Sequence, residues 1–502
     1  MKLSGADHNR LELLTPSAMY MVDKAAIEYG TDSKTLMYNA GVAVANSVQK
    51  HWPYGDILVL CGPGNNGGDG FVAAQRLVEY GRNVSLVLCG NKDKLSSDAR
   101  YFATRYQGEI LPFCTSILSE NISVVIDALF GAGLSRPLNA DIIEFMNMVS
   151  DRQIPVCAVD VPSGLCGTTG KPLGNTSFRA SRTLTFFCKK VGHLLQPGRQ
   201  LCGIVEVADI GISKKALKNI KISAYENSPT LWLHKMKWPH HMQHKYLRGH
   251  VVVMGSDQYI GATKLAAISA ARGGAGLVTV AATENTMPIY QSALTSIMVK
   301  HVSNEMGLDR LLSDKRINVV LTGPGFHPED NVRKHVLKIL SANKAVVLDA
   351  GAITSFSANS AELFNAISGP CVMTPHIGEF KQIFGDYDNK LEAAREASIR
   401  SNSVIVLKGS DTVIACPNGE AIINSNAPAW LATAGSGDVL AGLVAGLMAT
   451  GMQAFDAAAA AVWIHGEAAN MFGVGLIAED IPVNSAKVMS LLYNQYLQQQ
   501  AV

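Results

Sequence analysis

The chain has 502 residues, of which 48% are hydrophobic and 17% charged, and its formal net charge is +2. The composition is that of a globular protein, and the length corresponds to about two or three domains. The net charge lacks the basic excess of a nucleic-acid-binding protein. The nine cysteines include no CxxC pair, which argues against a disulfide scaffold or a zinc site. No apolar core of a secretory signal occurs in MKLSGADHNRLELLTP, so we expect a cytoplasmic protein that does not bind a membrane.

Short apolar runs alternate with amphipathic stretches in the first half of the chain. We expect strands at residues 56–61, 83–89, 123–130 and 154–161. Because these runs are apolar on both faces and separated by helical patterns, they predict a parallel sheet covered on both sides. Residues 17–49 are interpreted as two helices outside that sheet. The expected fold of this half is a Rossmann-like, three-layer α/β domain.

The alternation stops after ADIGI, and residues 214–240 are rich in lysine and histidine. The histidines here and just beyond are His234, His240, His241 and His244. A metal site is one interpretation, but no carboxylate or cysteine stands at ligand spacing, which favours a solvated linker. We therefore predict a first domain at residues 1–215, a linker at 216–240 and a second domain at 241–502.

A second α/β series begins at His250. Further strands are expected at residues 250–256, 277–282, 318–325, 345–351, 371–376 and 404–415. Helices are expected between most of them, and two long helices after Gly435. Residues 439–455 are the most apolar stretch of the chain. We interpret them as a buried helix and not a membrane span, because they are rich in Gly and Ala and lie between Asp438 and Asp456.

The loop GPGNNGGDG, residues 62–70, follows a strand and begins a helix. Its glycines allow a ligand to approach the backbone closely, and the free N–H groups of the helix start favour phosphate. The loop is not GxGxxG, and Asn65, Asn66 and Asp69 add side-chain donors and acceptors that a plain phosphate loop does not need. A tight structural turn is the alternative interpretation.

Two later strands also end in polar loops. Asp127 is followed by FGAGLSRP, and Asp160 is followed by VPSG. Because the carboxyl ends of parallel strands form the binding crevice of such a sheet, Asp127, Asp160 and Ser163 are expected near the NNGGD loop. A single Asp at a strand end often only caps a helix, but three such loops on one edge indicate a binding site.

These motifs, with the pattern D-x-x-F-G-x-G-x-x-R-P and AVDVPSGL, resemble the NAD(P)H-hydrate epimerase domain from about residue 17 to residue 212. Ser181 stands where that family often has an acid. The resemblance implies a catalytic Asp160 at the reacting ring and a potassium ion held by Asn66, Asp127 and Ser163. It implies that the hydrated dinucleotide is bound by Asn65, Asn66, Gly67, Gly68, Asp69, Gly131, Ala132, Gly133, Leu134, Ser135, Arg136, Pro137 and Asp160.

The motif LATAGSGDVLAGLVAGL places Gly435, Ser436, Gly437 and Asp438 at the start of a long helix. Its backbone N–H groups form an anion hole, and the helix dipole favours a developing phosphate. Asp438 is placed to take a proton from a substrate hydroxyl, as in ribokinase-like phosphotransferases. A purely structural charge at the helix N-terminus is the alternative.

The segment LKGSDTVI, residues 407–414, is predicted to form a strand, a loop and a second strand that hold an adenine nucleotide. In order along the chain, YIGATKLAA, LTGPG, TPHIGEF, LKGSDT and TAGSGDVLAG resemble the ADP-dependent NAD(P)H-hydrate dehydratase domain, which has a ribokinase-like α/β fold, over about residues 241–495. The resemblance implies hydrate binding by Ala262, Gly325, His376 and Asp438. It implies nucleotide binding by Lys408, Gly409, Ser410, Asp411, Thr412 and Gly437, with magnesium offsetting the charge.

Together the two resemblances imply a metabolite-repair enzyme. It would interconvert the S and R forms of hydrated NADH and NADPH, and dehydrate the S form at the expense of ADP to give AMP and phosphate. We expect a homo-oligomer. The alternative is a vitamin-type small-molecule kinase fused to a non-catalytic dinucleotide-binding module, because both folds also serve those purposes.

Overall fold

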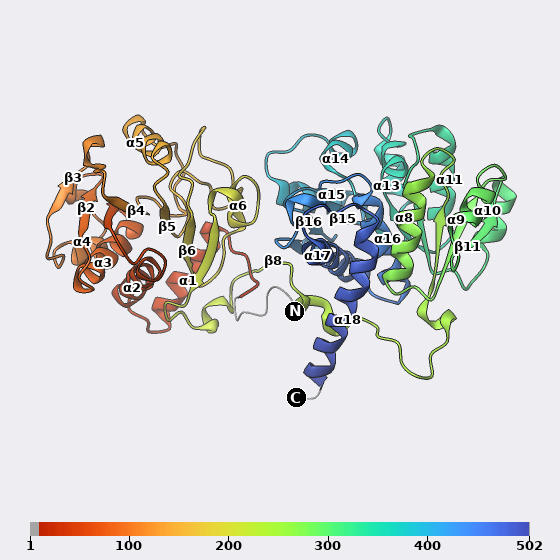
Figure 1. The fold of residues 1–502 in the computed structure, drawn as a ribbon, viewed down its shortest axis with the longest axis horizontal. Coiled ribbons are helices and arrows are strands. Elements are labelled where there is room, and N and C mark those ends of the chain that lie inside the picture. The colour runs from red at the N-terminus through yellow and green to blue at the C-terminus, as the bar shows by residue number, and fades with distance from the viewer. Residues whose placement is uncertain (1–9, 501–502) are drawn as a thin grey trace. The chain divides into compact units, whose positions relative to one another are not determined.

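The computed structural model describes residues 10–500, which form two compact units that meet in the sequence at Ala224 and Tyr225 (Figure 1). The first unit contains a seven-stranded sheet in the order β3-β2-β1-β4-β5-β6-β7, and all its paired strands are parallel. The strands are β1 (Asp56–Cys61), β2 (Val84–Leu88), β3 (Ile110–Pro112), β4 (Ile122–Ala128), β5 (Val156–Val159), β6 (Arg182–Phe186) and β7 (Ile204–Ala208). The chain reverses its direction of travel across the sheet between β1 and β4, which makes this the topological switch point.

Two hydrophobic clusters cover the two faces of this sheet. The helices of the unit are α1 (Pro16–Glu28), α2 (Ser33–His51), α3 (Asn65–Glu79), α4 (Ser97–Ala103), α5 (Ala140–Asp151) and α6 (Gly198–Leu201). One cluster joins the sheet to α1–α4, and the other joins it to α5 through Ile142, Phe145 and Val149. The predicted three-layer α/β fold is therefore confirmed. Both α1 and α2 begin where an oxygen of Thr15 or Asp32 accepts a backbone N–H of the first turn.

The second unit contains a ten-stranded sheet in the order β11-β10-β9-β12-β13-β14-β15-β16-β17-β8. It is parallel from β11 to β15 and antiparallel from β15 to β17. Its strands are β8 (Ala224–Glu226), β9 (His250–Met254), β10 (Leu277–Ala282), β11 (Met298–His301), β12 (Val319–Thr322), β13 (Ala345–Leu348), β14 (Cys371–Met373), β15 (Val404–Leu407), β16 (Val413–Ala415) and β17 (Ala421–Ile423).

Helices cover this sheet and form a large apolar core with it. They are α7 (Pro229–Trp232), α8 (Ile260–Arg272), α9 (Met287–Ala293), α10 (Glu305–Leu312), α11 (Asp330–Leu340), α12 (Gly351–Thr354), α13 (Ser360–Ala366), α14 (Ile377–Phe384), α15 (Lys390–Ser401), α16 (Ser436–Ala449), α17 (Ala454–Phe472) and α18 (Asp480–Gln500). Every residue of α16 from Val439 to Ala449 is buried, so the predicted buried helix is confirmed, although it ends at Ala449 and α17 starts within the same apolar stretch. Within residues 10–500, no helix has the length and apolarity that crossing a bilayer requires.

The segment predicted as a linker, residues 216–240, is not an exposed connection. Its first part stays with the first unit, where Ala216 is buried, and β8 lies beside β17 at the edge of the second sheet. Trp232 is fully buried and its ring centroid lies 5.9 Å from that of Trp463. Because lysines and histidines surround Trp232 in the sequence, its burial could not be predicted from the local pattern. All four histidines are exposed, and the described residues contain no cluster of three or more His, Cys, Asp or Glu side chains suited to a metal.

Candidate active sites

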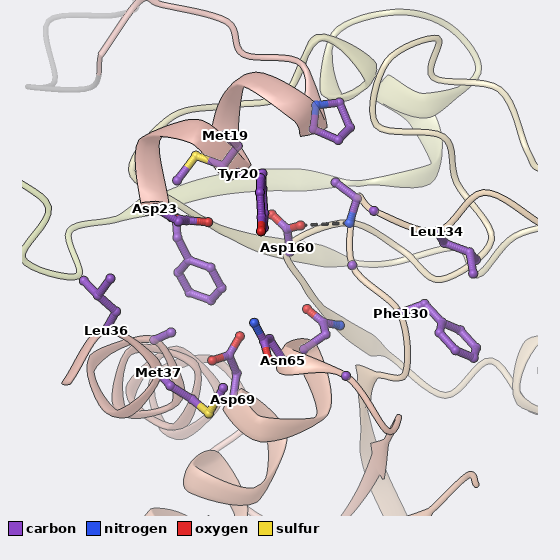
Figure 2. A pocket seen from close by; sticks show the side chains of 18 of the residues that line it. Met19, Tyr20, Asp23, Leu36, Met37, Asn65, Asp69, Phe130, Leu134 and Asp160 are labelled. Atoms are coloured by element: carbon purple, nitrogen blue, oxygen red, sulfur yellow. Dashed lines mark hydrogen bonds between the residues drawn. The ribbon is translucent and has the colours of Figure 1, made fainter. Parts of the chain in front are cut away.

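A cavity of about 610 Å³ opens in the first unit at the switch point between β1 and β4 (Figure 2). Its walls come from α1, from the loop that leads into α3, from the loop after β4 and from the ends of β5 and β6. The predicted residues that line it are Asn65, Asn66, Asp69, Gly131, Ala132, Gly133, Leu134, Arg136 and Asp160. The structure therefore brings the three sequence motifs together at one edge of the sheet.

The other predicted residues of these loops do not line the cavity. Gly67 and Gly68 are buried in the first turn of α3. A Cβ at Gly67 would lie 1.9 Å from the carbonyl oxygen of Gly62, and one at Gly68 would lie 2.4 Å from the sulfur of Met37. These glycines therefore allow the loop and helix to pack closely. Ser135 and Pro137 are also absent from the cavity wall.

Gly131 marks the point where the predicted loops meet. A Cβ at this position would lie 3.0 Å from Oδ2 of Asp160 and 3.1 Å from Oδ1 of Asn66. The absence of a side chain therefore leaves room between a carboxylate and an amide from two other loops.

Asp160 follows β5 with a left-handed backbone, φ 67°. Its carboxylate forms an ion pair with Nζ of Lys190 at 2.6 Å, and accepts hydrogen bonds from the hydroxyl of Thr185 at 3.0 Å and the N–H of Ala132 at 2.9 Å. Burial alone would raise the pKa of Asp160, but Lys190 and the hydrogen bonds outweigh it and lower the pKa to about 2. Asp160 is therefore an anion in fixed position at neutral pH. The sequence analysis did not identify Lys190.

Asp127 and Ser163, two of the predicted potassium ligands, do not line the cavity and are fully buried. The hydroxyl of Ser163 donates to Oδ1 of Asp127 at 2.6 Å, and its N–H donates to Oδ2 at 2.7 Å. Burial raises the pKa of Asp127 to about 6 in spite of these bonds, and no Lys, Arg or His of the described residues forms an ion pair with it.

The third predicted ligand, Asn66, has a buried Nδ2 without a hydrogen-bond partner in the described part of the chain. An amide in this state is satisfied when it turns its oxygen to a cation, and Asp127 lacks a positive partner. Carboxylate, hydroxyl and amide oxygens are suitable ligands for a hard cation. The residues present therefore fit a potassium ion.

In the second unit, Asp438 lies in the first turn of α16, where Gly435 has the left-handed φ of 87°. Lys408 forms an ion pair with the buried Asp349 at 2.8 Å, and a Cβ at Gly437 would lie 3.3 Å from Nζ of Lys408. The N-terminus of the helix, the lysine and two carboxylates thus share one site. Burial and the charge of Asp349 raise the pKa of Asp438 to about 7, although Lys408 opposes the shift.

His376 and Glu379 form a reciprocal cap at the start of α14. The N–H groups of Gly378 and Glu379 donate to Nδ1 of His376, and the N–H of His376 donates to Oε2 of Glu379 at 2.8 Å. Because Nδ1 accepts, the neutral ring carries its proton on Nε2. The side chain is 60% exposed, and its Nε2 lies 3.4 Å from Oε1 of Glu379. The negative charge of Glu379 also raises the pKa of Asp438.

Gly325 and Ala262, the other predicted hydrate-binding residues, lie together. The hydroxyl of Ser256 donates to the carbonyl oxygen of Gly325 at 2.7 Å. A Cβ at Gly325 would lie 3.2 Å from Cβ of Ala262 and 2.5 Å from the carbonyl oxygen of Tyr259. The structure therefore places these two positions next to each other.

The predicted nucleotide loop after β15 is supported from below by an ion pair. Lys390 contacts Asp411 at 2.5 Å, and both side chains are buried. The hydroxyl of Thr412 donates to the carbonyl oxygen of Gly409 at 2.9 Å. The side chains of Asp411 and Thr412 thus hold the shape of the loop. No sequence pattern points to Lys390 or Asp349, since each is paired with a residue that is distant in the sequence.

Comparisons with known proteins define the class first. Residues 33–192 match the family described as YjeF-related protein N-terminus, and residues 250–477 match the family described as NAD(P)H-hydrate dehydratase. The bifunctional NAD(P)H-hydrate repair enzyme of Salinibacter ruber is 34% identical over 92% of both chains. That of Moorella thermoacetica is 33% identical over 91% of both. The chain therefore belongs to the family of bifunctional NAD(P)H-hydrate repair enzymes.

Solved structures are similar to about half of the chain. The ADP/ATP-dependent NAD(P)H-hydrate dehydratase from Bacillus subtilis, co-crystallized with ATP and Mg²⁺, is 27% identical, with a TM-score of 0.47. The match covers 52% of the present chain and 96% of that chain.

Proposed function

We propose that the first unit interconverts the S and R epimers of hydrated NADH and NADPH, and that the second dehydrates the S epimer with ADP as phosphoryl donor. The observation that carries the proposal for the second unit is the grouping of Asp438, Lys408 and Asp349 at the N-terminus of α16. A carboxylate with a pKa near neutrality beside a helix N-terminus is suited to deprotonate a hydroxyl while phosphate charge develops.

In the proposed dehydration, Asp438 accepts the proton of the ring hydroxyl. The hydroxyl oxygen attacks the terminal phosphorus of ADP at the same time, and AMP leaves. Lys408 and the backbone N–H groups around Gly437 stabilise the charge. The ring nitrogen then expels phosphate, and loss of the proton from the neighbouring carbon restores the dihydronicotinamide. Asp349, Glu379 and Asp438 are oxygen donors that suit magnesium, which supplies charge neutralisation when bound.

In the proposed epimerisation, the hydrate occupies the cavity beside Asp160 and Gly131. Asn66, Asp127 and Ser163 would hold potassium, which supplies positive charge when bound. The fixed anion of Asp160 faces the ring, whose nitrogen becomes positive when the bond from the neighbouring carbon to its hydroxyl breaks. The carboxylate therefore favours the configuration change electrostatically.

A progress curve with mixed epimers, excess ADP and magnesium tests both activities through the absorbance of the dihydronicotinamide. Wild-type protein should convert both epimers to completion. Asp160→Asn should convert one fraction quickly and then stall, whereas Asp438→Asn should fail from the first turnover. Accumulation of a phosphorylated product, without release of phosphate, would instead support the small-molecule kinase alternative.

We further infer a reducing, cytoplasmic setting and a homo-oligomer. All nine cysteines are free thiols, which suits a reducing compartment. Exposed apolar side chains around the start of α18 support self-association: Val474, Ile477 and Val483 are 86%, 53% and 51% exposed. Light scattering of the purified protein should give a mass above the 53.5 kDa of the single chain, and a monomer would contradict the inference.

A further inference from the structure

Asp69 is a cavity residue of the first unit, and the family resemblance implies only that it binds the hydrate. It lies in α3, is only 9% exposed, and lines the cavity. Its carboxyl group has no hydrogen bond or ion pair within the described residues, whereas Asp160 has a lysine, a hydroxyl and an N–H. Figure 2 shows Asp23, Asp69 and Asp160 projecting toward the middle of the cavity from three different elements.

The environment of Asp69 opposes ionisation. Burial raises its pKa well above the usual value, the negative charges of Asp160 and Asp23 raise it further, and Lys190 opposes this shift. The other charged residues that line the cavity are Asp23, Asp98, Arg136, Asp160 and Lys190. The ring of the buried His193 is hydrogen-bonded to the backbone carbonyl oxygen of Asp160. Asp23, whose pKa burial raises to about 6, is largely ionised at pH 7.5. Among these carboxyl groups, Asp69 is the one with the strongest bias toward the protonated form, and it lines the cavity without a hydrogen-bond partner in the described part of the chain.

We propose that Asp69 is a catalytic acid of the epimerase, which gives its proton to the hydroxyl on the ring carbon beside the nitrogen. This inference rests on the proposed epimerase function. The carbon–oxygen bond breaks with its electron pair on oxygen, so that water leaves, while the lone pair of the ring nitrogen forms a carbon–nitrogen double bond. Asp160, held anionic by Lys190, stabilises the cation. Water then adds to the opposite face and releases its surplus proton to solvent, from which Asp69 is protonated again.

Two carboxyl groups in one cavity thus have different tasks because their surroundings differ. Lys190 contacts Asp160 at 2.6 Å and keeps it charged. Asp69 has no ion-pair partner among the described residues, and its surroundings favour the protonated form, so it is suited to donate a proton. The configuration is lost because the planar cation accepts water from either side.

The test follows the oxygen atom. Full-length protein is incubated in H₂¹⁸O with one purified epimer and without ADP, and the opposite epimer is analysed by mass spectrometry at early times against an enzyme-free control. We expect one solvent oxygen in each newly formed epimer. Retention of the original oxygen would overturn the proposal, because it would show ring opening and closure without departure of the hydroxyl.

Asp69→Asn keeps the size of the side chain but removes the acid. We expect it to slow epimer exchange by about 100-fold or more, while ADP-driven dehydration of the S epimer by the other unit reports that the protein is intact. Asp141→Asn, at an exposed position on α5, is the matched control and should exchange epimers normally. Exchange at the wild-type rate in Asp69→Asn would remove Asp69 from the mechanism.

A pH profile separates this role from a structural one. The wild-type rate should fall at high pH as Asp69 ionises, and Asp69→Glu, if active, should keep such a limb at a shifted position, whereas Asp69→Asn should lack it. A wild-type profile without a falling limb would contradict the inference. If wild-type protein does not exchange epimers at all, the proposed function fails. If it exchanges them with the original oxygen retained, only this inference fails.

Discussion

The raised pKa of Asp438 predicts that this residue destabilises the folded protein at neutral and higher pH. Burial and the neighbouring charges raise its pKa from 3.8 to about 7. Below about pH 4, such a carboxyl group is protonated in both the folded and the unfolded chain, and it leaves the free energy of unfolding unaffected. As pH rises, the unfolded chain ionises first, and the destabilisation is complete above about pH 7. The pKa difference corresponds to about 4 kcal/mol at most, and we expect about 2–3 kcal/mol because the group is partly exposed.

Asp438→Asn should therefore unfold at higher urea concentration than wild type at pH 8.5, and this difference should be several-fold smaller at pH 4.5. Tryptophan fluorescence reports this unit selectively, because Trp52 is the only one of the five tryptophans before residue 225. The same substitution should lower the dehydration rate by about 100-fold or more. Wild-type activity should rise with pH through about 7 as Asp438 loses its proton.

Asp388→Asn is the control, because Asp388 is exposed on the same unit. It should change neither stability nor activity at either pH. A variant Asp438→Asn that is no more stable than wild type at pH 8.5, or that gains the same stability at both pH values, would refute the reasoning. The carboxylate would then be stabilised in the folded protein to the same degree as in water.

Three further predictions follow from single contacts. Gly131→Ala should abolish epimer exchange and leave dehydration intact, because the new Cβ would lie 3.0 Å from Asp160; normal exchange would show that the hydrate binds elsewhere. Lys408→Met should abolish dehydration and destabilise the second unit by about 3–5 kcal/mol, because Asp349 stays buried without its cation. Phosphate release measures the first effect and urea unfolding the second. An unchanged unfolding midpoint would contradict the stabilising role of the ion pair between Lys408 and Asp349. Trp232→Ala should cost about 3–5 kcal/mol of the same unfolding free energy; no loss would mean that the segment is the linker the sequence suggested.

The sequence predicted the strands well because their apolar runs are local patterns. DILVLC, SVVIDALF and HVVVMGS all lie in parallel sheets, and the motifs after them meet at a strand edge as sheet topology requires. The linker prediction failed for a related reason. Residues 225–240 contain too short an apolar pattern to reveal that Trp232 fills the core of the second unit.

The groups that set the charge of the sites were beyond the reach of sequence patterns. Lys190 lies thirty residues after Asp160, and Asp349 lies fifty-nine residues before Lys408. Each partner of such a pair carries an ordinary local context, since a buried lysine differs from a surface one only through the folded chain around it. The resemblance to known domains predicts which residues bind the ligand, but the ionisation state of those residues follows from the three-dimensional contacts.

Both units illustrate one physical rule with opposite outcomes. Asp160 and Asp438 each stand near the carboxyl edge of a parallel sheet, and burial disfavours the charge of both. Lys190 contacts Asp160 directly, so this carboxylate remains charged throughout the neutral range. Near Asp438 the cation of Lys408 is already paired with Asp349, whose negative charge adds to the burial. The lysine therefore makes a fixed anion in one unit, whereas its prior pairing leaves a titratable proton acceptor in the other.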